Sequence, residues 1–106
     1  MAHTVIDDLT AAVDMQAGAV VSKVVCREPG VNVTVFGLDA GEGLTEHRAA
    51  RAAVAQVISG RLRFTADGDE MDAGPGFWIY IAPNTRHALT AVEPTVMLLT
   101  LLTVGE

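Results

Sequence analysis

The chain has 106 residues, and 50% of them are hydrophobic, which is enough for one domain with a core but too little for two. Thirteen acidic and seven basic residues give a net charge of −6, which excludes a general binder of nucleic acid or of anionic membranes. The single cysteine, Cys26, excludes an intramolecular disulfide and a multi-cysteine zinc module. We therefore expect one domain over residues 1–106. Because no signal peptide and no long apolar run is visible, we expect a cytoplasmic protein.

The first predicted elements are a short helix and a pair of strands. Residues 7–14 place acidic residues ahead of a small apolar face, which predicts at most a short N-terminal helix. Residues 19–26 are rich in valine and predict a strand that ends at the turn residues Pro29 and Gly30. Valine alternates with other residues over 31–38, so we expect a second strand with an apolar face.

The middle and end of the chain predict further short strands. The alanine-rich stretch 48–55 would be a helix by propensity alone, but its surroundings favour a loop that leads into a strand. Residues 56–65 are interpreted as two strands around a Ser-Gly turn, and 77–81 as an aromatic, β-branched strand. The last segment, 95–104, is almost wholly apolar and must be buried on both faces or lie against a partner. Six to eight such strands indicate a sandwich or small barrel.

Two stretches resemble the paired sequence motifs of the cupin superfamily. The first motif has the form G-x5-H-x-H-x3,4-E-x6-G, and here Gly41, His47 and Gly60 match it. The second has the form G-x5-P-x-G-x2-H-x3-N, and Gly76 and His87 match it, with the proline moved by one position. The resemblance covers about residues 31–102. It implies an all-β fold, the double-stranded β-helix or jelly-roll barrel.

The resemblance also bears on metal binding. Many cupins hold a divalent metal with three histidines and a glutamate, and His47 and His87 match two of those positions. Ala49 and Ala53 occupy the other two, and alanine has no lone pair to donate. We therefore expect no cofactor; a divalent metal held weakly by the two histidines is the alternative.

The candidate ligand pocket comprises His47, His87, Gln56, Arg48, Arg51 and Trp78. Arg48 and Arg51 flank the altered motif positions, where a guanidinium suits a carboxylate, or else they belong to a solvated loop. Gln56 lies within a strand and either finds a polar partner inside the barrel or points outward. Trp78 and Tyr80 share one side of a strand, which faces the barrel interior, a neighbouring sheet or a partner subunit.

Three functions remain open at this point. The first is a small-molecule-binding module with an apolar barrel, and the missing metal ligands favour it, together with the third, over the second. The second is a metal-dependent enzyme of the oxygenase or isomerase type with an incomplete ligand set; its catalytic residues are unknown. The third is a structural protein whose main property is dimerisation. The apolar excess, including residues 96–102, and the resemblance both imply a homodimer.

Overall fold

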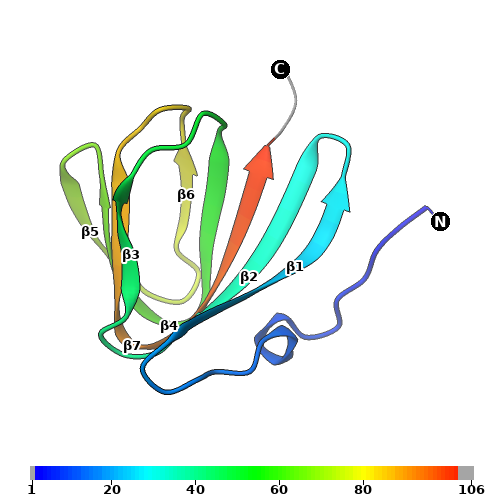
Figure 1. Ribbon diagram of the computed structural model, residues 1–106, viewed down its shortest axis with the longest axis horizontal. Coiled ribbons are helices and arrows are strands. Elements are labelled where there is room, and N and C mark those ends of the chain that lie inside the picture. Colours follow the sequence, from blue (N-terminus) through cyan, green and yellow to red (C-terminus); the bar gives the residue numbers. More distant parts are fainter. Residues whose placement is uncertain (1, 103–106) are drawn as a thin grey trace.

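The computed structural model describes residues 2–102, which form one 3-10 helix and seven strands (Figure 1). The elements are η1 (Leu9–Ala12), β1 (Val20–Glu28), β2 (Val31–Leu38), β3 (Gly43–His47), β4 (Ala53–Ala66), β5 (Asp69–Ala73), β6 (Trp78–Ile81) and β7 (His87–Leu102). The expected N-terminal helix is a single 3-10 turn, capped by the Asp8 carboxylate, which accepts the Thr10 N–H at 3.0 Å. Residues 103–104, the end of the last predicted strand, lie outside the described residues. The all-β fold class is confirmed.

Two long strands, β4 and β7, each belong to two sheets. The second half of β7 pairs with β2 and with the first half of β4, whereas the first half of β7 pairs with β3 and with the second half of β4. The remaining pairs complete a five-strand sheet, β1-β2-β7-β4-β6, and a four-strand sheet, β3-β7-β4-β5. All of these pairs are antiparallel. The two sheets therefore meet where β4 and β7 bend, and they diverge toward the other end of the barrel (Figure 1).

The bend in β4 lies at Gly60, whose φ is +90°. A Cβ at this position would collide with the backbone of β7 and with Thr95. Thr95 is completely buried, and its hydroxyl accepts the N–H of Arg61 at 3.0 Å and donates to the carbonyl oxygen of Glu93 at 2.7 Å. The prediction of two strands within residues 56–65 is wrong. The chain bends at Gly60 without reversing, because β7 pairs with β4 on both sides of the bend.

The main core lies between the two sheets. Its buried members come from five of the strands: Leu38, Ala55, Val57, Leu62, Phe64, Ala73, Ile81, Leu89, Ala91 and Met97. Phe36 of β2 and Leu99 of β7 pack against this cluster. Because side chains alternate along a strand, the residues directly before and after each of them lie on the outer face of the sheet. The last strand is thus buried on its inner side along Met97 and Leu99.

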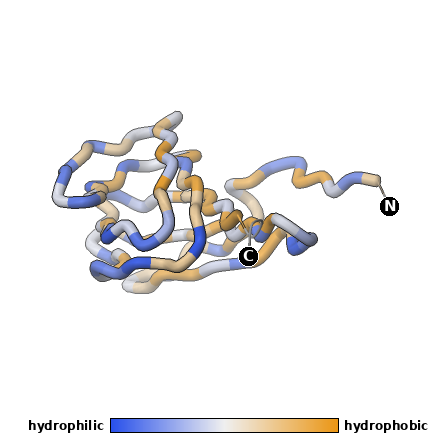
Figure 2. Tube along the Cα trace, turned by 90° about the horizontal axis from the view of Figure 1, so that it is seen from above, coloured by the Kyte–Doolittle hydropathy of each residue, from blue (hydrophilic) through white to orange (hydrophobic). Residues whose placement is uncertain are grey.

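Part of the outer face of the five-strand sheet is covered by the segment that follows η1. Gly37 on β2 lies opposite Val96 on β7, and a Cβ at Gly37 would lie 3.2 Å from Val13 and 3.5 Å from the sulfur of Met15. Val96 is 6% exposed. Ahead of η1, the N-terminal arm extends away from the barrel (Figure 2). Among residues 2–102, no helix is long and apolar enough to cross a membrane.

Candidate functional site

His47 and His87 lie side by side at the end of the four-strand sheet. They are directly opposite each other in the pairing of β3 with β7, just after a register shift that follows Leu44. Their ring centroids are 4.2 Å apart, and the ring planes make an angle of 63°. His87 begins β7, so the pair lies at the end of the barrel remote from the Gly60 bend. The structure thus brings together the two histidines that match the motifs of the sequence resemblance.

Each histidine is oriented by the backbone two residues before it. The Nδ1 atom of His47 lies 2.8 Å from the carbonyl oxygen of Thr45, and that of His87 lies 2.9 Å from the carbonyl oxygen of Thr85. Because a carbonyl oxygen only accepts, Nδ1 must carry the proton in both rings, and in the neutral imidazoles Nε2 is then the acceptor. Neither Nε2 atom has a hydrogen-bond partner within residues 2–102. The site therefore presents two adjacent acceptor nitrogens.

The histidines form one side of a small cavity between the sheets. Its other lining residues are apolar: Leu44, Ala55, Phe64, Ile81, Leu89, Met97 and Leu99. The volume of the cavity is about 30 Å³. A cavity needs roughly 10–15 Å³ on the same measure to hold one water molecule, so this one is large enough for a water. His87 is half-buried and His47 is exposed, so the histidines separate the cavity from the surface. In this state the cavity accommodates only a small chemical group.

Two loops lie next to the histidine pair and are joined to each other. The first, residues 48–52, connects β3 to β4, and the second, residues 82–86, connects β6 to β7. The N–H of Asn84 donates to the carbonyl oxygen of Ala49 at 2.7 Å, and Asn84 adopts φ +64° to do so. This contact fixes both loops around the end of the barrel that carries the histidines.

The remaining candidate residues do not line the cavity. Arg48 and Arg51 lie in the first of these loops, where Arg48 is exposed and Arg51 is half-buried. Gln56 alternates with the buried Ala55 and pairs with Trp78, so both Gln56 and Trp78 lie on the outer face of the five-strand sheet. Trp78 is 58% exposed there. Of the two orientations open to Gln56, the structure has the outward one.

The residues present do not fit the metal site that the sequence resemblance implies. Ala53 begins β4 on its inner face and is 6% exposed, while Ala49 is half-buried in the loop. Within residues 2–102, no three His, Cys, Asp or Glu side chains converge on one point. Zinc sites and non-haem iron sites take at least three protein ligands. Two imidazoles alone supply no such set.

Sequence reasoning missed one polar residue inside the barrel. Asn32 on β2 shares the inner face with Phe36, and its Oδ1 atom is buried without a hydrogen-bond partner. The valines of the same strand, whose alternation predicts its apolar face, point outward instead. Val35 is fully buried although it does not belong to the main core, so part of the outer face of β2 is covered as well. A buried polar atom without a partner is uncommon, so Asn32 is a further polar group of the interior.

Two sheets that share bent antiparallel strands around an apolar core, with paired histidines at the open end, define a jelly-roll barrel with a site at its mouth. The family model described as the cupin domain matches residues 34–104. The chain belongs to the cupin family.

Solved structures with this fold are similar over most of the chain. A conserved protein of unknown function from Streptococcus pyogenes is 27% identical, with 100% of this chain and 93% of that one covered and a TM-score of 0.87. A cupin 2 conserved barrel domain protein from Leptotrichia buccalis is 28% identical, with 89% of this chain and 46% of that one covered and a TM-score of 0.82. KdgF from Halomonas sp. is 22% identical, with 85% and 84% covered and a TM-score of 0.77, which shows a common fold. A search of curated proteins finds no significant match.

Proposed function

We propose that this cupin is a small-molecule-binding protein whose ligand donates hydrogen bonds to Nε2 of His47 and His87. The observation that supports this most directly is the arrangement of the two rings, with each Nδ1 held by a backbone carbonyl at 2.8 or 2.9 Å and each Nε2 left as an acceptor. A hydroxyl or an N–H group satisfies such an acceptor, whereas the lone pairs of a carboxylate are repelled by it. The ligand class is therefore a hydroxyl- or amine-bearing molecule.

The size of the cavity limits how the ligand binds. About 30 Å³ between apolar walls admits a methyl or hydroxyl group beyond the histidines, but not a ring. The body of the ligand then lies over the two loops that surround the pair. Arg48 is exposed in one of them, where its guanidinium would suit an anionic group on the far side of the ligand. The proposal includes no reaction and no metal. We also propose that the protein is cytoplasmic, because a chain with a single cysteine suits a reducing compartment.

The test is a fragment screen by NMR on the wild type and on three histidine variants. We expect fragments with a hydroxyl or amine to shift resonances of cavity residues such as Leu89 and Met97. His47→Ala and His87→Ala should each weaken this binding by about 10-fold, the effect of one lost hydrogen bond. His3→Ala is the matched control, because His3 is exposed in the N-terminal arm, and it should change nothing.

Three results would contradict the proposal. If no fragment shifts the cavity resonances, or if His3→Ala weakens binding as much as His87→Ala, the histidine pair is not the binding site. If the wild type retains stoichiometric zinc, nickel or iron through dialysis, the metal-dependent alternative replaces the binding module.

A further inference from the structure

Asn32 is a polar residue on a largely apolar wall of the barrel. It lies on the inner face of the five-strand sheet, where Phe36, Ile81 and Leu99 also lie. The Oδ1 atom of Asn32 is buried and accepts no hydrogen bond from residues 2–102. The Nδ2 atom has no partner in this part of the chain either, but it is not buried, because Asn32 as a whole is half-buried. One end of the amide is thus isolated inside the wall, and the other end can be reached.

An amide at this position lowers the stability of the protein. A buried acceptor that has lost its water without gaining a partner costs free energy, whereas a leucine of similar size would avoid that cost. The two cross-strand neighbours do not satisfy the amide, since Arg27 of β1 is exposed and Leu101 of β7 is apolar. A side chain that works against the fold in this way is expected where it serves binding.

The strand pairing places Asn32 at the mouth of the barrel, beside the histidine cavity. Asn32 lies opposite Leu101, two residues beyond Leu99, and Leu99 lines that cavity. Residues on such a diagonal are roughly 7–8 Å apart, which is within reach of a small ligand. The N–H of Leu102 donates to the carbonyl oxygen of Ala52 at 2.9 Å, so the loop between β3 and β4 borders the same end of the sheet. A ligand that lies over this loop therefore passes close to Asn32.

We propose that the amide of Asn32 binds a second polar group of the ligand, so that the site selects molecules with two hydroxyl groups over molecules with one. This inference rests on the proposed function, in which one donor group of the ligand binds His47 and His87. An amide can turn over, which exchanges its nitrogen and its oxygen, and the end that can be reached then changes from donor to acceptor. A hydroxyl group satisfies both orientations, whereas a carboxylate or an ammonium group satisfies only one.

The ligand class is accordingly a short, uncharged diol or polyol. One hydroxyl group binds the histidines and the other binds Asn32. The carbon chain between them lies against Leu99, the apolar residue that separates the two polar positions on the wall. Asn32 is then a specificity-determining residue, because it distinguishes ligands by a group that the histidines do not contact.

The experiment compares linear diols of three to six carbons with the mono-alcohols of the same length, by NMR titration of the cavity residues Leu89 and Met97. The wild type should bind the best-fitting diol at least about 5-fold more tightly than the matching mono-alcohol, for one further hydrogen bond. Asn32→Leu should remove that preference and leave the affinity for the mono-alcohol unchanged. Asn32→Ala should remove it too, which separates the loss of the amide from a blockage of the mouth by leucine.

Thermal unfolding of the same proteins without ligand gives a second readout. Asn32→Leu should raise the melting temperature by about 4 °C or more, because the unpartnered acceptor is gone. Gln16→Leu is the matched control, since it also replaces an amide. Gln16 is exposed and precedes β1, whose first residue Val20 pairs with Leu38 at the other end of β2 from Asn32. This control should change neither the diol preference nor the affinity for mono-alcohols.

Three results would overturn this inference alone. They are a wild type that binds mono-alcohols as tightly as diols, a diol preference that survives in Asn32→Leu, and an Asn32→Leu protein less stable than the wild type, which would give the amide a role in the fold. In each case, mono-alcohol binding that His87→Ala weakens leaves the proposed function standing. If neither the diols nor the mono-alcohols shift the cavity resonances, the proposed function is wrong and this inference fails with it.

Discussion

Ala53 and Ala49 occupy the two positions where the sequence resemblance implies metal ligands beside His47 and His87. The methyl group of Ala53 points into the barrel at the start of β4, where Ala53 is 6% exposed, and Ala49 lies in the adjoining loop. A carboxylate at Ala53 and an imidazole at Ala49 would add an anion and a third nitrogen to the two histidines. With alanine at both positions, the two histidines are left with fewer donor groups than the three protein ligands that a zinc or non-haem iron site takes.

The double variant Ala49→His with Ala53→Glu should gain metal affinity. We expect zinc or nickel to bind at least about 100-fold more tightly than to the wild type, because four donor positions replace two. Without metal, the variant should be less stable, since a carboxylate replaces a buried methyl group. Isothermal titration and thermal unfolding with and without metal measure both effects. Equal metal affinity in wild type and variant would mean that the native chain holds a third ligand.

Thr95 is the residue that connects the two bent strands. Its buried hydroxyl is bonded to the N–H of Arg61 and to the carbonyl oxygen of Glu93. Thr95→Val keeps the shape but leaves that N–H without a partner, so it should lower the free energy of unfolding by about 1–3 kcal/mol. Thr95→Ser keeps the hydroxyl and should lose less, apart from the small cavity left by the methyl group. Urea unfolding of the three proteins compares them, and equal stability of the valine variant would show that the hydroxyl is not needed at the bend.

At the scale of elements, the turn before β1 is attached to the end of β2 by one carboxylate. Asp39 accepts the N–H of Gly18 at 2.7 Å and the N–H of Ala40 at 2.9 Å. These hydrogen bonds, the one from Gly18 first, hold the pKa of Asp39 below its usual 3.8. A carboxyl group with a lowered folded-state pKa stabilises the protein above its unfolded-state pKa. That contribution is lost as pH falls through the folded-state value.

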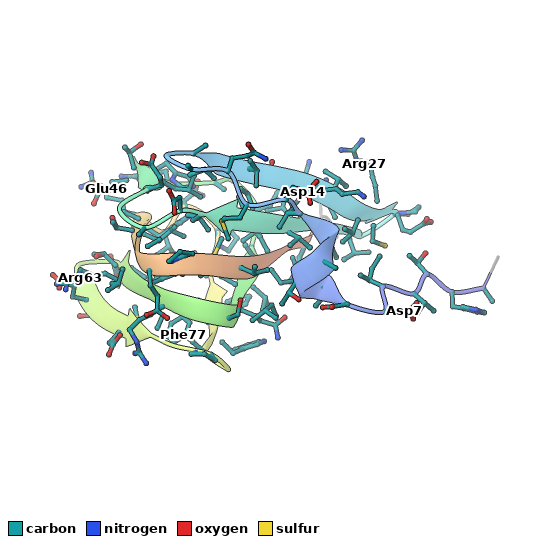
Figure 3. All side chains as sticks on the ribbon, turned by 90° about the horizontal axis from the view of Figure 1, so that it is seen from below. Asp7, Asp14, Arg27, Glu46, Arg63 and Phe77 are labelled. Atoms are coloured by element: carbon teal, nitrogen blue, oxygen red, sulfur yellow. The ribbon has the colours of Figure 1, made fainter. Side chains whose placement is uncertain are left out.

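Asp39→Asn should therefore change the pH profile of stability. At neutral pH the variant should unfold at a lower temperature than the wild type, and the difference should shrink below pH 3.8 and vanish once Asp39 is protonated. Thermal unfolding between neutral and strongly acidic pH measures this difference. Asp7→Asn, in the exposed arm (Figure 3), is the control and should follow the wild type throughout. A constant difference at all pH values would mean that the charge of Asp39 is not involved.

The elements that sequence could predict are those with local causes. The β1–β2 hairpin follows from valine-rich segments on both sides of Pro29 and Gly30, and Gly30 adopts φ +89°. The strand β4 was misread because Ser59 and Gly60 have the local chemistry of a turn, whereas the pairing with the distant β7 decides its course. The proximity of His47 and His87 was implied by the resemblance to the cupin motifs, and no local property of either segment predicts it.

Side-chain direction was less predictable, since it depends on which face of each strand is covered. In β4, alanines occupy the inner face and Gln56 the outer one, and a propensity argument does not distinguish the two faces. In β2, the valines turn outward and Val35 is fully buried on that face, while Asn32 turns inward. Neither choice is visible until the long-range packing is known.

At the scale of the whole molecule, the two sheets are not independent units. Each of the two shared strands carries hydrogen bonds in both sheets, so separating the sheets requires breaking the pairing of β4 with β7 along both halves. Most of the fold therefore opens together, and protection from hydrogen exchange should extend across the bend.

The central place of β7 also orders events during synthesis. This strand is the last of the described ones to leave the ribosome, yet β2, β3 and β4 all pair with it. Before it emerges, only the hairpin β1–β2 and the pairs that β4 makes with β5 and β6 are available, and their inner faces have nothing to close against. A nascent chain in which β6 has emerged from the ribosome but β7 has not thus exposes its apolar inner faces to solvent. The barrel then closes in one late step, when β7 pairs in the middle of both sheets.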